Sequence, residues 1–186
     1  KEYYNDLKYL LTEYDRVTEA IIPVTAKLFE PHLQTMEIKL RPGLITLTWT
    51  SMNIDTYKSN FSSGLSKLED MVHKMNDITE SRIQKNLKSL SRAVLCNLPD
   101  SRTVALDEFV TMQEGAVRTS TTFLTSKNLE VELAVNDLFD LLRSHAVDPS
   151  VDPIDENEVA VVFRHFNSMT YQALLNCVKV SLNYVK

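Results

Sequence analysis

Glycine is scarce in this 186-residue sequence, which contains only Gly43, Gly64 and Gly115. Sheet hairpins and phosphate-cradling loops both rely on glycine, so its scarcity disfavours β folds and nucleotide-binding loops. No Gly-x-x-x-x-Gly-Lys, Gly-x-Gly-x-x-Gly or Gly-x-Ser-x-Gly pattern occurs. We therefore expect an all-α chain that has no nucleotide site and no catalytic site of its own.

Cysteine, basic charge and long apolar runs are also limited. Cys96 and Cys177 lie in helix-like apolar patterns without metal-ligand spacing, so we expect reduced core thiols, as in a cytosolic protein. The formal net charge of -5 argues against a general nucleic-acid binder. No apolar run approaches the roughly 18 residues that a membrane span needs. These absences predict no metal, no cofactor, no nucleic-acid partner and no membrane association.

Two patterns resemble metal sites only weakly. Asp70 and His73 stand three residues apart, but a metal site in a helical bundle needs two Glu-x-x-His pairs and further carboxylates. The acidic run 148–158 lacks the spacing and the glycine of a calcium loop. We expect His73 to be an ordinary surface or boundary residue, and the acidic run to be a solvated loop and a helix cap.

The N-terminal segment predicts a helix with a kink. Pro23 removes one backbone donor and crowds the preceding turn, so the helix should bend there and continue. Pro31 should interrupt it again, and Arg41, Pro42 and Gly43 should end it. Its apolar seam alternates steps of four and three residues, at Tyr3, Leu7, Leu10, Tyr14, Val17 and Ile21.

A second, longer helix is expected over residues 53–95. The preceding residues 44–50 alternate like a strand but have no partner strand, so they are better interpreted as an extended linker. Ser51 and Asn53 are suitable N-caps. At 1.5 Å per residue the helix would be about 60 Å long, which favours an elongated bundle. Its seam changes register between Met75 and Ile83, as a stutter does.

The rest of the chain predicts three more helices. The first covers 106–123 and the second begins near Asn128. After a loop at 145–154, the last helix has a capping box formed by Asp155 and Glu158. Because both chain ends lie inside helical patterns, residues 1–186 are expected to be one segment cut from a longer chain. The last seam should contain Val159, Phe163, Phe166, Thr170, Ala173, Cys177, Val180 and Tyr184.

Two features suggest interaction surfaces. Lys85, Lys88 and Arg92 share one face of the long helix, so they could meet an acidic partner such as a microtubule, although a simple solvated face is the stronger interpretation. Trp49, the only tryptophan, is either a buried anchor at a turn or a binding hot spot. The seam that contains Leu10 is expected to pack partly on adjoining helices or on another subunit.

Residues 40–57 carry a longer motif. They contain Leu-x-Pro-Gly-Leu, then Leu-Thr-Trp-Thr-Ser, then Asn-Ile with a tyrosine three residues on. This pattern resembles the N-terminal tail region of dynein heavy chains, above all those of axonemes. Weaker similarity on both sides extends the resemblance over nearly the whole chain. It implies structural roles for the motif residues: Pro42 and Gly43 as a turn, Trp49 as an anchor, and Ser51 or Asn53 as a cap.

The resemblance implies a non-catalytic role in a ciliary motor. Tail regions of this family are stacks of helical bundles that associate with other heavy chains, with intermediate and light chains, and with docking factors on doublet microtubules. ATP hydrolysis belongs to other parts of those long chains, so no catalytic residue is carried over. The expected location is the cytoskeleton of the ciliary axoneme. The alternative is a stand-alone, spectrin-like helical adaptor.

Overall fold

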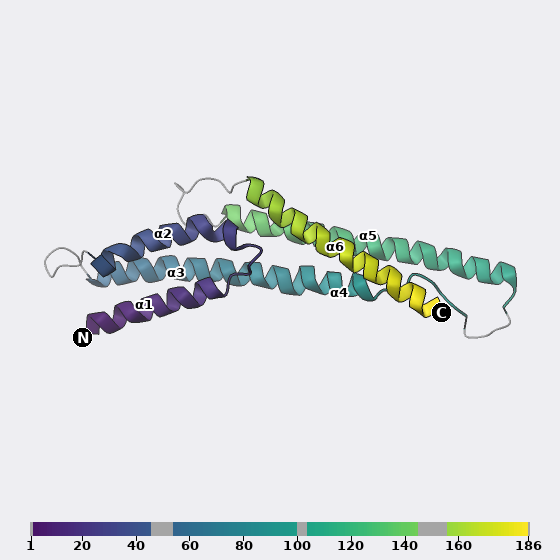
Figure 1. Ribbon diagram of the computed structural model, residues 1–186, viewed down its shortest axis with the longest axis horizontal. Helices are drawn as coiled ribbons and strands as arrows, with labels where there is room; N and C mark the ends of the chain where they lie inside the picture. Colours follow the sequence, from purple (N-terminus) through teal and green to yellow (C-terminus); the bar gives the residue numbers. More distant parts are fainter. Residues whose placement is uncertain (1, 46–53, 100–103, 145–155, 186) are drawn as a thin grey trace. The chain divides into compact units, whose positions relative to one another are not determined.

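The fold is all-α in the part of the chain that the structure describes. The computed structural model describes residues 2–45, 54–99, 104–144 and 156–185. The expected all-α class is confirmed, and no strand occurs within these ranges. The elements, shown in Figure 1, are α1 (Glu2–Glu19), α2 (Ala26–Ile45), α3 (Ile54–Asp77), a π-helical segment η1 (Ile78–Gln84), α4 (Lys85–Arg92), α5 (Leu106–Ser144) and α6 (Glu156–Val185).

The chain forms two compact units. The first unit comprises Lys1–Asp77 and Leu138–Val162, and the second comprises Ile78–Asp137 and Phe163–Lys186. Both α5 and α6 therefore contribute residues to each unit. The two units are described separately below.

The first unit contains two separate helices where the sequence predicted one kinked helix. Helix α1 ends at Glu19 and α2 starts at Ala26, and a turn closed by the Thr25 amide and the Ile22 carbonyl (2.9 Å) separates them. The prediction of a bend at Pro23 was wrong. Proline disfavours the helical conformation of the residue before it, here Ile22, so the chain turns instead of bending.

The prolines of α2 were also misjudged. Helix α2 continues through Pro31 and through Pro42 and Gly43 to Ile45. A proline removes one helical hydrogen bond, but the surrounding turns of a packed helix can compensate for that loss. The predicted interruption at Pro31 and the predicted stop at residues 41–43 are therefore both wrong.

Helices α1, α2 and α3 pack on one another and form most of the first unit's core. The predicted α1 seam is confirmed at Leu10, Tyr14 and Val17, which are all buried. On α3 the seam is buried at Phe61, Leu65, Leu68, Val72 and Met75. Ion pairs link the helices at their edges: Arg16 with Glu69 (2.5 Å) and Lys58 with Asp6 (2.6 Å). The Tyr57 hydroxyl donates a hydrogen bond to the Leu40 carbonyl at 3.2 Å and so joins the start of α3 to α2.

The expected register change lies in η1. Met75, Thr79, Ile83 and Leu87 are all buried, at three successive steps of four residues. An ordinary α-helix with 3.6 residues per turn would rotate such positions away from one face. The wider π turn between Ile78 and Gln84 keeps them in line. The predicted stutter is thus confirmed as a local change of helical winding, and the predicted helix 53–95 is a continuous helical path from Ile54 to Arg92.

The two helices predicted at 106–123 and after 128 are one. Helix α5 runs for 39 residues without a break. The predicted break between residues 123 and 128 was wrong, because the polar side chains of Thr125, Ser126 and Asn128 also fit an exposed helix surface. The first half of this helix is only half-buried at Phe109, and Val117 is 60% exposed.

The last seam drifts around α6. Phe166, Thr170, Ala173 and Cys177 are buried as predicted, but the next buried residue is Ser181. Val180 and Tyr184 are exposed, so this seam is only partly buried within the described residues, as expected. A straight helix drifts by about 20° per heptad from a strict seven-residue repeat, which moves the buried stripe onto Ser181.

Candidate functional site

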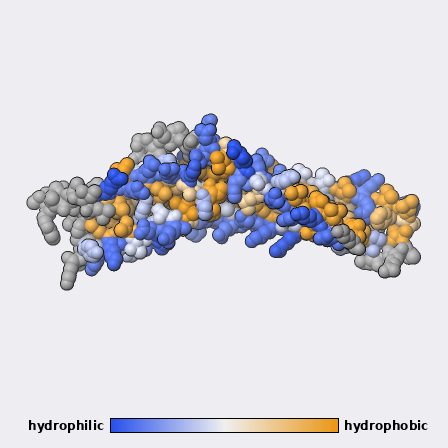
Figure 2. All heavy atoms as spheres, in the orientation of Figure 1, coloured by the Kyte–Doolittle hydropathy of each residue, from blue (hydrophilic) through white to orange (hydrophobic). Residues whose placement is uncertain are grey.

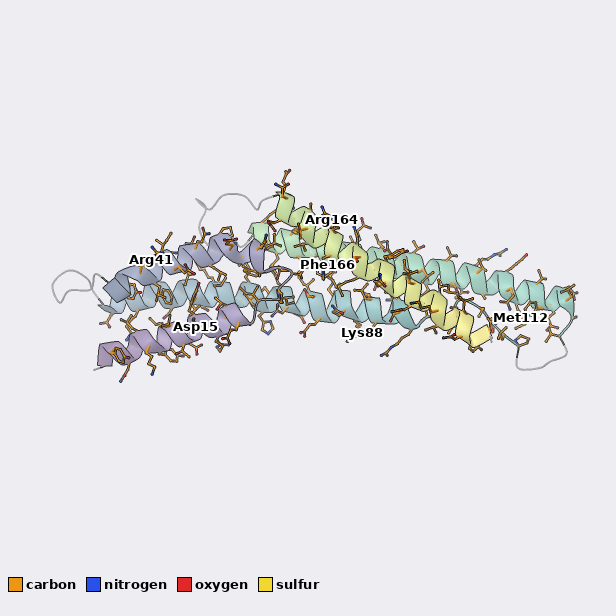
Figure 3. All side chains as sticks on the ribbon, in the orientation of Figure 1. Asp15, Arg41, Lys88, Met112, Arg164 and Phe166 are labelled. Carbon is orange, nitrogen blue, oxygen red and sulfur yellow. The ribbon has the colours of Figure 1, made fainter. Side chains whose placement is uncertain are left out.

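The basic residues of α4 form an exposed stripe. Lys85, Lys88 and Arg92 are all exposed, on the side of the helix opposite the buried Leu87 and Leu90. Lys85 lies close enough to Glu130 of α5 to contribute to lowering the pKa of that carboxyl, a shift to which the hydrogen bond from Lys127 contributes most. Among the described residues, no carboxylate forms an ion pair with Lys88 or Arg92. In Figure 3 the Lys88 side chain extends away from the ribbon of α4.

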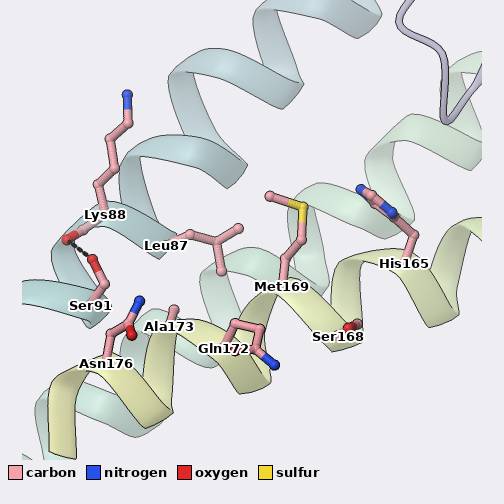
Figure 4. Close-up of a pocket in the computed structure, with 9 residues that line it drawn as sticks. All are labelled: Leu87, Lys88, Ser91, His165, Ser168, Met169, Gln172, Ala173 and Asn176. Carbon is pink, nitrogen blue, oxygen red and sulfur yellow. Dashed lines mark hydrogen bonds between the residues drawn. The ribbon is translucent and has the colours of Figure 1, made fainter. Parts of the chain in front are cut away.

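An open groove of about 320 Å³ lies beside this stripe, between α4 and α6 of the second unit. Leu87 and Ala173 are 5% and 6% exposed and form its apolar floor. Figure 4 shows Leu87 and Met169 extending toward one another from the two helices. The lining residues are Leu87, Lys88, Ser91, His165, Ser168, Met169, Gln172, Ala173 and Asn176. The groove combines an apolar floor with polar and basic edges, which suits a side chain of a partner better than a small reactant.

An extended segment supports α6 near this groove. The Leu95 amide donates to Ser181 Oγ at 2.9 Å, and the Cys177 thiol donates to the Ala93 carbonyl at 3.3 Å. On the other side, Gln113 of α5 exchanges hydrogen bonds with the Asn97 backbone. The backbone is no longer helical after Arg92, and these hydrogen bonds satisfy backbone donors and acceptors that have no helical partner.

The two cysteines belong to this support. Both are unpaired, as predicted, and Cys177 is buried. Burial raises the pKa of the Cys177 thiol, so the protonated form is favoured. A buried, protonated thiol is a poor nucleophile, which agrees with a packing role.

Several residues singled out from the sequence lie outside the described residues, namely Trp49, Ser51, Asn53 and Asp155. Glu158 lies in the first turn of α6, with its carboxylate 3.3 Å from the Lys27 ammonium.

Three other predicted positions are described. Pro42 and Gly43 lie inside α2, so the predicted turn there was wrong. Leu10 is 5% exposed and belongs to the first unit's own core. It is therefore not available to a partner, although the sequence suggested it as a possible interface residue. His73 is exposed, as predicted.

Sequence reasoning missed the burial of His32. His32 is 4% exposed, its Nδ1 atom has no hydrogen-bond partner within the described ranges, and burial lowers its pKa. Burial and the nearby Glu37 carboxylate raise the pKa of Tyr14 to about 12. The pattern of Leu33, Met36 and Leu40 predicted the buried face of this segment. Met36 and Leu40 are buried as that pattern predicted, and only its first position differs, because His32 is buried there while Leu33 is half-buried.

No cluster of three or more His, Cys, Asp or Glu residues in the described part of the chain is placed to hold a metal ion. None of the helices in the described ranges is long and apolar enough to cross a membrane.

Comparisons with known proteins identify the chain's relatives. Residues 1–57 match the family described as dynein heavy chain, N-terminal region 1. The whole chain is 37% identical to the dynein gamma chain of the flagellar outer arm of Chlamydomonas reinhardtii, over 4% of that protein's length. The chain belongs to the axonemal dynein heavy chains. This heavy-chain segment is also 35% identical over 168 residues to axonemal heavy chain 5 of Rattus norvegicus, covering 90% of the segment and 5% of the relative.

A human relative is similar over a shorter part of the segment. Dynein axonemal heavy chain 8 of Homo sapiens is 28% identical over 137 residues, which cover 74% of the segment and 3% of that protein. The segment therefore spans about one twentieth or less of the length of each of these relatives. Its match is to the N-terminal region of dynein heavy chains.

Proposed function

We propose that this chain is a non-catalytic tail segment of a ciliary dynein heavy chain. It serves heavy-chain association, binding of intermediate and light chains, and docking to axonemal doublet microtubules. One observation carries the proposal: the chain matches a flagellar outer-arm heavy chain over all 186 residues. The comparisons give no support to the alternative of a stand-alone, spectrin-like adaptor.

The structure supports an assembly role through its surfaces. In the second unit, large apolar residues are exposed along the first half of α5 and the last half of α6, where Figure 2 shows hydrophobic atoms at the surface. Contiguous apolar surface of this kind favours contact with another protein element. The residues are Leu106, Val110, Val117, Val178, Leu182 and Val185.

The proposal assigns ATP hydrolysis to other parts of the full heavy chain, and the ciliary axoneme as the location. The segment itself needs no cofactor in this role. Its contribution is mechanical: it holds the heavy chain within the arm, while chemistry proceeds elsewhere.

The proposal is tested by separating assembly from catalysis in the full-length heavy chain. Leu10→Asp places a charge in the first unit's core, where an unpaired buried charge is strongly unfavourable. We expect a large loss of incorporation into axonemes and unchanged ATPase activity of the soluble heavy chain. Incorporation is measured by quantitative immunoblotting of isolated axonemes.

Leu11→Asp is the matched control, because Leu11 is the neighbouring leucine and is 37% exposed. It should incorporate near normally. Normal incorporation of Leu10→Asp would contradict the tail role, and loss of ATPase activity with normal incorporation would contradict the separation of the two functions.

A further inference from the structure

The parts of α4 and α6 that belong to the second unit carry positive charge only. Residues 85–92 and 163–185 contain lysines and arginines and not a single aspartate or glutamate, although the whole chain has a net charge of -5. The basic residues are Lys85, Lys88 and Arg92 on α4 and Arg164 and Lys179 on α6. All five are exposed, and Arg164 projects from α6 in Figure 3. Acidic residues of the second unit lie on other elements, mainly α5.

Only some of the positive charges near the groove are neutralised by carboxylates of the second unit. Arg82 of η1 pairs with Asp137 of α5, and Lys85 lies near Glu130. Beyond these, Lys88 and Arg92 have no ion-pair partner among the described residues. Positive charge around an apolar groove attracts carboxylates and repels other basic surfaces.

The groove adds an apolar anchor point to this charge. Its floor is made by Leu87, Met169 and Ala173, and the Lys88 and His165 side chains stand at its edges. A lipid or nucleic-acid phosphate would use the charge but not the apolar floor. A helical segment that bears both leucine-type side chains and carboxylates would use both.

We propose that the α4–α6 groove binds an acidic amphipathic segment of another polypeptide in the assembled motor. Apolar side chains of that segment lie on Leu87, Met169 and Ala173, and its carboxylates face Lys88 and Arg92. The proposal rests on the tail role, and it adds a defined surface and the chemistry of the partner.

The test is zero-length carbodiimide crosslinking of intact, purified arms, followed by mass spectrometry. This reagent joins a lysine amine to a carboxylate only where the two groups are in contact. We expect Lys88 to be joined to an Asp or Glu within an apolar–acidic helical sequence of an associated subunit. Lys88→Arg keeps the charge and removes the reactive amine, so it should abolish this crosslink and leave the subunit bound.

Charge reversal gives the energetic readout. Lys88→Glu should weaken retention of that subunit about fivefold in salt washes, as expected for the loss and reversal of a contact at the edge of an interface. Arg118→Glu on α5 is the matched control, since Arg118 is an exposed base of the same unit with no ion pair among the described residues. It should leave retention unchanged.

Three results would overturn the inference. These are crosslinks from Lys88 to a second copy of this chain, crosslinks from Lys88 to tubulin, or free labelling of Lys88 by an amine-reactive reagent in the intact arm. Each would be obtained with arms that assemble, so the tail role would stand. The tail role itself would be contradicted by a different result, the normal incorporation of Leu10→Asp into axonemes.

Discussion

The first and second units use the same kind of sequence in different ways. In the first unit, α1, α2 and α3 cover one another, and the fully buried residues include Phe29, Phe61 and Met36. The second unit leaves Leu106, which is 79% exposed, and other large apolar residues at its surface. The first unit also exposes some large apolar residues, such as Ile38, but the second unit exposes more of them and therefore presents more surface that another protein element can cover.

Helix α5 shows this contrast within one element. Between Leu106 and Glu130 no residue is buried, whereas Val131, Val135 and Leu138 are all buried. Helices in proteins are held mainly by packing of an apolar face. The second half of α5 already has such packing contacts within the described residues, whereas the first half needs another protein element to provide them.

The largest expected effect is on the core of the first unit. Phe61→Ala removes a side chain that is 1% exposed, and should lower the free energy of unfolding by about 3–5 kcal/mol through lost burial and the cavity left behind. Val117→Ala in the second unit, at a 60% exposed position, should change it by less than about 0.5 kcal/mol. Urea denaturation followed by circular dichroism measures both. Equal losses would mean that the two units do not differ in this way.

The elements that the sequence predicted well are those where one face is buried along the whole helix. Phe61, Leu65 and Leu68 keep a heptad rhythm because α3 packs continuously on α1 and α2. The errors fall where local signals were given too much weight. Pro23 makes a turn, Pro42 lies inside a helix, and the polar run near Asn128 does not end α5. Tertiary packing decides such cases, and a single sequence does not show it.

The second expected effect concerns pH and the first unit. Burial lowers the pKa of His32 below its ordinary value of 6.5, so the unfolded chain binds a proton more readily than the folded chain. Stability should therefore be complete above that value and should fall as the pH drops through and below it. His32→Phe removes the titrating group and should flatten this dependence, as measured by urea midpoints at a series of pH values. His165→Phe, at an exposed position of the second unit, should leave the dependence intact, and an unchanged profile for His32→Phe would contradict the assignment.

The candidate site was only partly predictable. The basic stripe was identified because Lys85, Lys88 and Arg92 repeat with helical spacing. The groove was not identified, because it depends on which face of α6 meets α4. That pairing brings Met169 beside Leu87, although Met169 stood outside the predicted seam.

The smallest expected effect compares two glycines. Gly115→Ala in α5 meets no atom within 4 Å, so it should stabilise the helix by about 0.8–1 kcal/mol through helix propensity alone. Gly64→Ala in α3 places its new methyl group 3.0 Å from the Met36 sulfur. Since Met36 is fully buried, we expect its displacement to offset most of the same gain. Thermal melting of the two variants makes the comparison, and an equal gain at both positions would show that the first unit's core is looser than described.

The π-helical segment also constrains how this chain can change in length. Three steps of four residues keep Met75, Thr79, Ile83 and Leu87 on one face only because η1 winds more widely than an α-helix. A π turn holds one more residue than an α turn, so deletion of one residue from Ile78–Gln84 would be absorbed by a return to ordinary α-helical winding, which leaves Leu87 and Lys88 on their faces. A deletion within α4 has no such reserve, because every later position would shift by about 100° around the helix axis. Loss of Asn86 would therefore place Lys88 where Leu87 now lies and displace the basic stripe and the groove together.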